Sequence, residues 1–123
     1  MREIKFRCYD TSKKVLYPPS SIWKMNLMTY EDNYNLKLMQ YTGLKDKNGI
    51  EIYEGDIVQD SSSRLMVVEW DDRIGTSRFI FKTLNEIGHI KTGRYLNTNE
   101  WVTSYKNDIQ VIGNIYENKD LLN

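Results

Sequence analysis

Short β-strand patterns follow one another along most of this chain, and no helix-length segment separates them. Residues 3–8 alternate polar and apolar side chains, which is the period of a strand with one buried face. Residues 65–70 and 78–82 are rich in β-branched and aromatic side chains, which favour strands. Strands this closely spaced predict antiparallel pairing, because parallel strands need long crossover connections between them.

Two dipeptides mark tight turns near the middle of the chain. Asn48-Gly49 is a strong turn signal because both residue types tolerate a positive φ angle. Gly55-Asp56 follows closely and predicts a second turn. These turns divide the middle of the chain into short extended segments.

The remaining predicted strands are placed by residue range. Residues 2–17 are predicted to form an N-terminal hairpin, and residues 64–82 are predicted to form a second hairpin. Residues 87–91 fit a short irregular strand. Residues 100–105 and 109–116 are predicted to be the last two strands.

The C-terminal end carries further local signals. Ile109, Val111 and Ile115 are expected to share one face of the last strand. Gly113 interrupts this pattern and predicts a β-bulge. Residues 117–123 are expected to form a single helical turn.

These elements predict a mainly β fold, or at most a β-rich α+β fold. The antiparallel strands are expected to form a small, partly open SH3-like barrel that also carries the N-terminal hairpin. The length of 123 residues fits a single domain over residues 1–123.

Two sets of side chains are predicted to be buried. Trp70 is expected to pack in the core beside Phe79 and Phe81. In the first strand, the alternation places an apolar set on one face and a polar set on the other. The apolar set is Ile4, Phe6 and Cys8, and the polar set is Glu3, Lys5 and Arg7.

Charge and cysteine content argue against several classes of protein. The 17 Lys and Arg residues equal the 17 Asp and Glu residues, whereas a dedicated nucleic-acid binder usually has a clear basic excess. The single cysteine, Cys8, excludes an intrachain disulfide and fits a reducing compartment. No apolar run matches a signal peptide or a membrane span, so we expect a cytoplasmic protein that does not enter membranes.

No set of catalytic or metal-binding residues stands out. His89 is the only histidine and is far in sequence from Cys8, so zinc and catalytic-triad chemistry lack partners. The acidic stretch that begins at Asp46 does not place oxygen ligands at the positions of an EF-hand. We therefore expect no enzymatic activity, no cofactor, no bound metal and no small-molecule ligand.

The segment from Tyr41 to Val58, which we call the central block, is open to two interpretations. One is a binding loop that presents the polar side chains of Asp46, Asn48, Glu51, Glu54 and Asp56. The other is structural, with tight turns at Gly49 and Gly55 and apolar anchors on either side. The structural interpretation is favoured, because turn glycines and apolar anchors account for most of the pattern without a ligand.

Three ordered blocks of sequence carry a family resemblance. They are Arg2-Glu-Ile-Lys-Phe-Arg, the stretch from Leu38 through Glu51-Ile-Tyr-Glu-Gly-Asp-Ile-Val, and Val111-Ile-Gly-Asn-Ile-Tyr-Glu-Asn. In this order they resemble the YopX family of bacteriophage and prophage proteins, although Cys8-Tyr9 stands where the family commonly has Ala-Trp. The resemblance implies a phage or prophage origin, a β-rich fold and an intracellular place in a bacterial host. It implies no particular activity.

Binding to a partner is the remaining expectation. The candidate partner-binding residues are Arg64, Arg73, Arg78, Lys82, Arg94 and Tyr95. The content of nine tyrosines and three tryptophans suits contact with a protein partner or a homo-oligomer. The alternative is that the basic and aromatic residues between positions 64 and 94 bind nucleic acid through stacking and phosphate contacts. The balanced charge favours the protein partner or homo-oligomer over nucleic acid.

Overall fold

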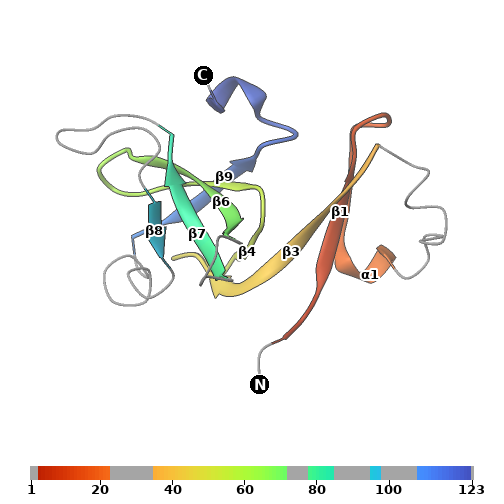
Figure 1. Ribbon diagram of the computed structural model, residues 1–123, viewed down its shortest axis with the longest axis horizontal. Coiled ribbons are helices and arrows are strands. Elements are labelled where there is room, and N and C mark those ends of the chain that lie inside the picture. The colour runs from red at the N-terminus through yellow and green to blue at the C-terminus, as the bar shows by residue number, and fades with distance from the viewer. Residues whose placement is uncertain (1–2, 23–34, 72–77, 85–94, 98–107, 123) are drawn as a thin grey trace.

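The structure is a computed structural model, and it describes residues 3–22, 35–71, 78–84, 95–97 and 108–122. Within these residues the chain forms two antiparallel sheets (Figure 1). This arrangement confirms the predicted mainly β, antiparallel class. None of the helices in the described part is long and apolar enough to cross a membrane.

In the described residues, the first sheet contains four strands in the spatial order β2-β1-β3-β4. These strands are β1 (Phe6–Asp10), β2 (Val15–Tyr17), β3 (Leu36–Lys45) and β4 (Glu51–Tyr53). Strands β1 and β2 form the predicted N-terminal hairpin, in which Cys8 lies opposite Tyr17. The short helix α1 (Pro19–Ile22) follows β2 and lies beside β1 (Figure 1).

The part of the second sheet that the structure describes contains five strands in the order β8-β7-β6-β5-β9. These strands are β5 (Asp56–Gln59), β6 (Leu65–Asp71), β7 (Arg78–Thr83), β8 (Tyr95–Asn97) and β9 (Gln110–Asn114). The sheet curls into part of a barrel and stays open, as the sequence predicts (Figure 1). Strands β6 and β7 form the predicted second hairpin, with Trp70 opposite Phe79. We call this sheet the curled sheet.

The chain after β9 forms a short helix near the C-terminus. A 3-10 helix, η3 (Lys119–Leu122), follows β9 and confirms the predicted helical turn. The strands predicted over residues 87–91 and 100–105 lie outside the described residues.

The burial of the first strand differs from the prediction. Ile4 and Phe6 are 69% and 37% exposed, although the alternation predicts both to be buried. Cys8 is buried as predicted. Arg7 on the opposite face is mostly covered, because its guanidinium pairs with Asp56. The polar face of β1 therefore packs against the protein, which a two-residue period alone does not indicate.

Trp70 also lies in a different place from the one predicted. Phe79 and Phe81 are buried as expected, but Trp70 is 39% exposed. Its ring meets the Phe79 ring edge to face, with the two centroids 4.9 Å apart. Trp70 pairs with β7 but has no partner residue in β5, so the curled sheet covers it on one side only. The prediction that Trp70 is enclosed in the core is wrong.

Positive φ angles confirm both turns predicted in the central block. Gly49 has a φ of 80° and Gly55 a φ of 88°. A third glycine, Gly43, has a φ of 87° within β3, where the register with β4 shifts between Tyr41 and Lys45. Glycine is favoured in this region of φ because it has no Cβ atom.

The bulge predicted at Gly113 is confirmed by the pairing of β5 with β9. Ile57 lies opposite Gly113 and the next residue, Val58, lies opposite Val111, so Ile112 is the extra residue. Ile115 follows the end of β9, and it therefore does not share a strand face with Val111 as the sequence suggests.

Candidate functional site

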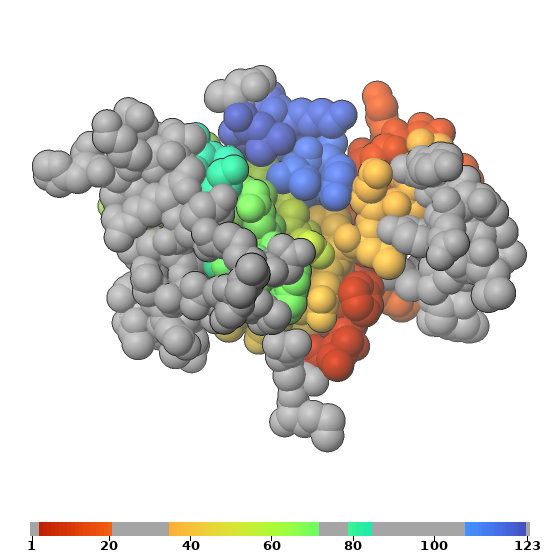
Figure 2. All heavy atoms as spheres, viewed as in Figure 1, coloured from red at the N-terminus to blue at the C-terminus, as the bar shows by residue number. Residues whose placement is uncertain are grey.

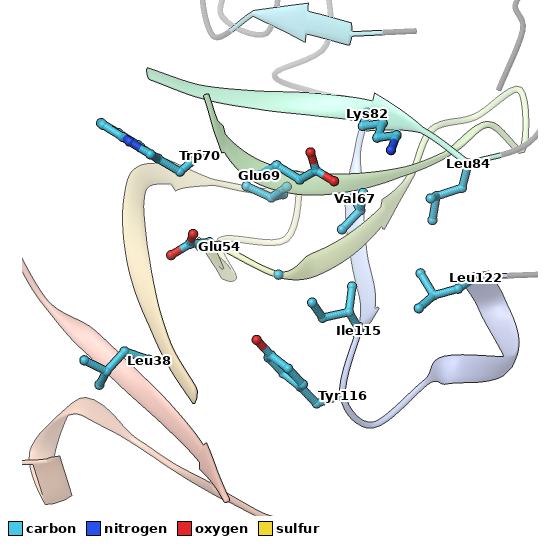
Figure 3. Close-up of a pocket in the computed structure, with 12 residues that line it drawn as sticks. Leu38, Glu54, Val67, Glu69, Trp70, Lys82, Leu84, Ile115, Tyr116 and Leu122 are labelled. Atoms are coloured by element: carbon cyan, nitrogen blue, oxygen red, sulfur yellow. The ribbon is translucent and has the colours of Figure 1, made fainter. Parts of the chain in front are cut away.

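A groove of about 510 Å³ lies where the two sheets meet (Figure 3). Leu38 of β3 lines one side, and Val67 and Lys82 of the curled sheet line another. Ile115 and Tyr116, which follow β9, form a third side. On the face drawn in Figure 2, the C-terminal residues (blue) lie between the N-terminal strands (red and orange) and the curled sheet (green).

Gly55 joins the backbone segments that border the groove. Its N–H donates to the Val68 carbonyl at 2.8 Å, and its carbonyl accepts a hydrogen bond from the Ile115 N–H at 2.9 Å. A Cβ atom at Gly55 would lie 3.1 Å from the Met39 Cε atom. Glycine is therefore needed here for the positive φ and for the close approach of these segments.

Asn114 turns the chain after β9 toward the groove. Its side-chain oxygen accepts hydrogen bonds from the N–H groups of Tyr116 at 3.0 Å and Glu117 at 2.9 Å. Asn118 in turn accepts a hydrogen bond from the Asn114 N–H at 3.0 Å. A Cβ atom at Gly113 would lie 2.2 Å from that Asn118 oxygen, so glycine leaves room for the turn. The turn directs the Tyr116 ring into the groove (Figure 3).

Apolar side chains line much of the groove and reach its surface. Trp70 and Leu122 stand at opposite sides of the close-up and are 39% and 40% exposed (Figure 3). Leu84 and Ile115 gather with Leu122 at one end of the groove (Figure 3). Large apolar side chains exposed in a concave site are typical of surfaces that bind partners.

Three of the described residues that line the groove are charged: Glu54, Glu69 and Lys82. All three are partly exposed. Among the described residues, neither carboxylate has a hydrogen-bond or ion-pair partner. The described lining therefore carries two negative charges and one positive charge.

Two ion pairs connect β1 and the residue before it to the central block. Lys5 pairs with Glu51, and Arg7 pairs with Asp56. The Arg7 guanidinium also lies over the Tyr53 ring, 4.4 Å from its centroid. The first and second blocks of the family resemblance are thus joined by charge pairs.

Asp56 is the most deeply buried member of these pairs. It is 1% exposed, and its second oxygen accepts a hydrogen bond from the Tyr53 N–H at 2.8 Å. Burial raises the pKa of Asp56 from 3.8 to about 6, although Arg7 and the Tyr53 N–H act in the opposite direction. Asp56 therefore holds structure together and does not face a ligand.

Asp46 has a similar structural role. One oxygen accepts hydrogen bonds from the N–H groups of Asn48 at 2.8 Å and Ile50 at 2.9 Å. The other accepts a hydrogen bond from the Val111 N–H at 2.9 Å, which fastens β9 to the central block. Of the five polar residues in the binding-loop interpretation, only Glu54 lines the groove. The structural interpretation accounts for Asp46 and Asp56.

The structure describes four of the six residues predicted to bind a partner. Arg64 is 4% exposed and its Nε donates to Asp60 at 3.0 Å, which corrects the prediction that Arg64 is a surface contact. Lys82 lines the groove and lies opposite Tyr95 in the register of β7 with β8. Arg78 begins β7. Arg73, Arg94 and His89 lie outside the described residues.

Sequence reasoning missed Glu69, Trp70 and Leu122 as groove residues. Their positions in strand and helix patterns indicate only local structure, whereas the groove joins distant parts of the chain. For Arg64, a local signal was available. Asp60 precedes a serine-rich turn and accepts hydrogen bonds from the N–H groups of Ser62 and Arg64, as a turn-forming aspartate often does.

Metal-binding chemistry has no visible basis in the part of the chain that the structure describes. It contains no group of three or more His, Cys, Asp or Glu side chains that could hold a metal ion. Cys8 is buried, and this burial raises the pKa of its thiol.

Comparisons with known proteins identify the family of the chain. The crystal structure of protein EF1440 from Enterococcus faecalis is similar over 100% of both chains, with a TM-score of 0.63 and 26% sequence identity. No curated protein matches the chain. A family model described as YopX protein matches residues 5–123, which is nearly the whole chain. This protein therefore belongs to the YopX family.

Proposed function

We propose that this YopX protein is a non-enzymatic binding module that docks a segment of a protein partner in the groove between its two sheets. The observation that carries the proposal is the concave site of about 510 Å³ at which Trp70 and Leu122 are exposed and Tyr116 points inward. Tryptophan and tyrosine are enriched among the residues that dominate protein contacts.

A polypeptide segment suits the shape of this groove. Trp70 stands at one side, and the apolar group that includes Leu84 and Leu122 stands at the other (Figure 3). An extended segment presents several side chains along its length, so it can occupy both places at once. This distribution supports a peptide-like occupant.

Nucleic acid is the alternative, and the described residues support it less. Binding to nucleic acid needs basic side chains that face the phosphates. Arg64 is buried, and Lys82 shares the groove with Glu54 and Glu69, whose carboxylates would repel phosphates. A protein partner is therefore the better-supported occupant.

The proposed setting is the cytoplasm of a bacterium that carries the phage or prophage. The family resemblance supports this setting. The single cysteine, Cys8, is buried and free, which is compatible with a reducing compartment.

A displayed library of random peptides tests whether the groove binds protein segments. Wild-type protein is expected to retain a set of peptides from the library. The variants Trp70→Ser and Leu122→Ser should bind these peptides at least tenfold more weakly than wild type does. Ile50→Ser is the matched control, because Ile50 is 53% exposed and does not line the groove. Both groove residues are exposed, so their substitution should leave the fold intact.

Three outcomes would overturn the proposal. The first is a library that yields no peptide whose binding depends on Trp70 or Leu122. The second is binding of labelled DNA at low salt that these two variants abolish, since that result would place nucleic acid in the groove. The third is hydrolysis or another chemical change of the retained peptides.

A further inference from the structure

The groove carries an excess of negative charge in its described lining. Glu54 and Glu69 come from different segments, and the hydrogen bond from the Gly55 N–H to the Val68 carbonyl holds their neighbours together. Lys82 is the one basic residue in that lining. The whole chain has a formal net charge of zero, so this local excess is a property of the site.

Both carboxylates are free to meet a ligand. Among the described residues neither has an ion-pair or hydrogen-bond partner, in contrast to Glu51, Asp56 and Asp60, which all have one. Both residues are partly exposed, so the unpaired charges remain hydrated in the free protein. A cation that enters the groove would give each carboxylate a partner.

Apolar side chains lie on both sides of the two carboxylates. In the close-up, Glu54 and Glu69 lie between Trp70 on one side and Leu122 on the other (Figure 3). A charge pair formed in such a concave, partly dehydrated site is stronger than the same pair on an open surface. A ligand with a basic side chain next to apolar side chains would match both the unpaired carboxylates and the apolar side chains beside them.

We infer that the groove selects a partner segment in which a lysine or arginine lies beside apolar side chains. This inference rests on the proposed function and adds the chemistry of the partner to it. The apolar side chains of the segment contact Trp70 and the Leu122 end, and the basic side chain contacts Glu54 and Glu69. An acidic segment is rejected, because its carboxylate would meet two others.

Three synthetic peptides test this charge selection. They keep the apolar residues of a peptide that the groove retains and differ only in a central lysine, glutamine or glutamate. Fluorescence anisotropy should show the lysine peptide binding about fivefold more tightly than the glutamine peptide, and the glutamate peptide binding most weakly. High salt should reduce these differences, because salt screens exposed charges.

Variants of the protein assign the effect to the two carboxylates. Glu54→Gln/Glu69→Gln should bind the three peptides with nearly equal affinity. Asp120→Asn is the matched control for Glu69→Gln alone, since each removes one negative charge and Asp120 is exposed and does not line the groove. If the double variant does not fold, Glu69→Gln alone provides the test. The logarithm of the ratio between its affinities for the lysine and glutamine peptides should be half the wild-type value.

The outcomes separate this inference from the proposed function. In one outcome, binding needs Trp70, but the lysine, glutamine and glutamate peptides bind equally well or the glutamate peptide binds best. This outcome would leave the proposed function standing and overturn the charge selection. Peptides that ignore Trp70 would overturn both. Self-association that Trp70→Ser abolishes would place a second copy of the chain in the groove and would also overturn the inference.

Discussion

Within the described part of the chain, two clusters of buried side chains hold the protein together, and they differ in chemistry. The core of the curled sheet contains Ile52, Val58, Met66, Val68, Phe79, Phe81 and Ile109. The second cluster, which we call the tyrosine cluster, contains Tyr9, Met39, Tyr41 and Tyr53, with Tyr116 packed against it. The first has no hydroxyl or charged group among these side chains, whereas the second is mostly tyrosine.

The tyrosine cluster depends on contacts with defined geometry. Tyr9 stacks on Tyr116 with the ring centroids 5.4 Å apart and an interplanar angle of 12°. The Tyr53 hydroxyl donates to Glu51 at 3.1 Å, and Arg7 lies over the same ring. Such contacts fix orientation, whereas the burial of aliphatic side chains is not directional.

The difference in chemistry between the core of the curled sheet and the tyrosine cluster explains where the groove forms. Val67 and Val68 of β6 lie on one side of the groove, and Tyr116, which packs against the tyrosine cluster, lies on another. Burial of apolar surface stabilises the curled sheet, and oriented rings and ion pairs place the N-terminal strands beside it. The groove is the space left at that boundary.

Truncation of the core of the curled sheet is expected to have the largest effect on stability. Phe81 is 2% exposed, so Phe81→Ala should lower the free energy of unfolding by about 3 to 5 kcal/mol. Chemical denaturation followed by fluorescence measures this loss. Ile50→Ala at an exposed position should change it by less than about 0.5 kcal/mol. Similar losses in the two variants would contradict the assignment of the core.

Removal of Arg7 tests the charged part of the tyrosine cluster. Arg7→Met leaves Asp56 buried without its cation and should cost about 3 kcal/mol at neutral pH. Arg7→Met/Asp56→Asn should recover part of this loss, because it removes the unpaired charge and keeps an acceptor for the Tyr53 N–H. The Arg7 Nε is buried with no hydrogen-bond partner among the described residues, so the pair is incompletely satisfied. A double variant less stable than Arg7→Met would contradict this account.

A smaller effect is expected from pH. The pKa of Asp56 is about 6 in the folded protein, above its ordinary value of 3.8, so the folded state binds this proton more tightly than the unfolded chain. The stability that this proton contributes is full below about pH 4 and is lost as the pH rises through about 6. The loss is at most about 3 kcal/mol.

The comparison that isolates this effect is wild type against Asp56→Asn. Denaturation at several pH values should show wild type losing stability relative to the variant between pH 4 and 6. A relative gain for wild type as the pH rises toward about 4, with no loss between pH 4 and 6, would show that Arg7 outweighs burial and that the pKa of Asp56 lies below its ordinary value.

Local chemistry made much of the fold predictable. Both hairpins, the turns at Gly49 and Gly55 and the bulge at Gly113 depend on residues close in sequence. Residues in the blocks that resemble the family mostly form turns within the block or ion pairs with another block. Asn114 and Asn118 form a turn, and Asp46 organises the loop that follows it.

Contacts between distant segments were not predictable in the same way. Alternation indicates two faces of β1 but does not say which of them meets the central block, and Arg7 rather than Phe6 is the covered one. The same limit applies to Trp70, whose exposure depends on where β5 begins.

The sequence by itself determined a mainly β, antiparallel fold and its turns, because strand period and turn chemistry are local properties. Its ordered blocks also carried the resemblance to the YopX family, which the family model matches over residues 5–123. Only the tertiary structure decided which charged groups are buried in pairs and which are free. Glu54 lies in the groove and Asp56, two residues later, is paired with Arg7 inside the protein. The two carboxylates have similar chemistry, and their environments are set by segments far away in the chain.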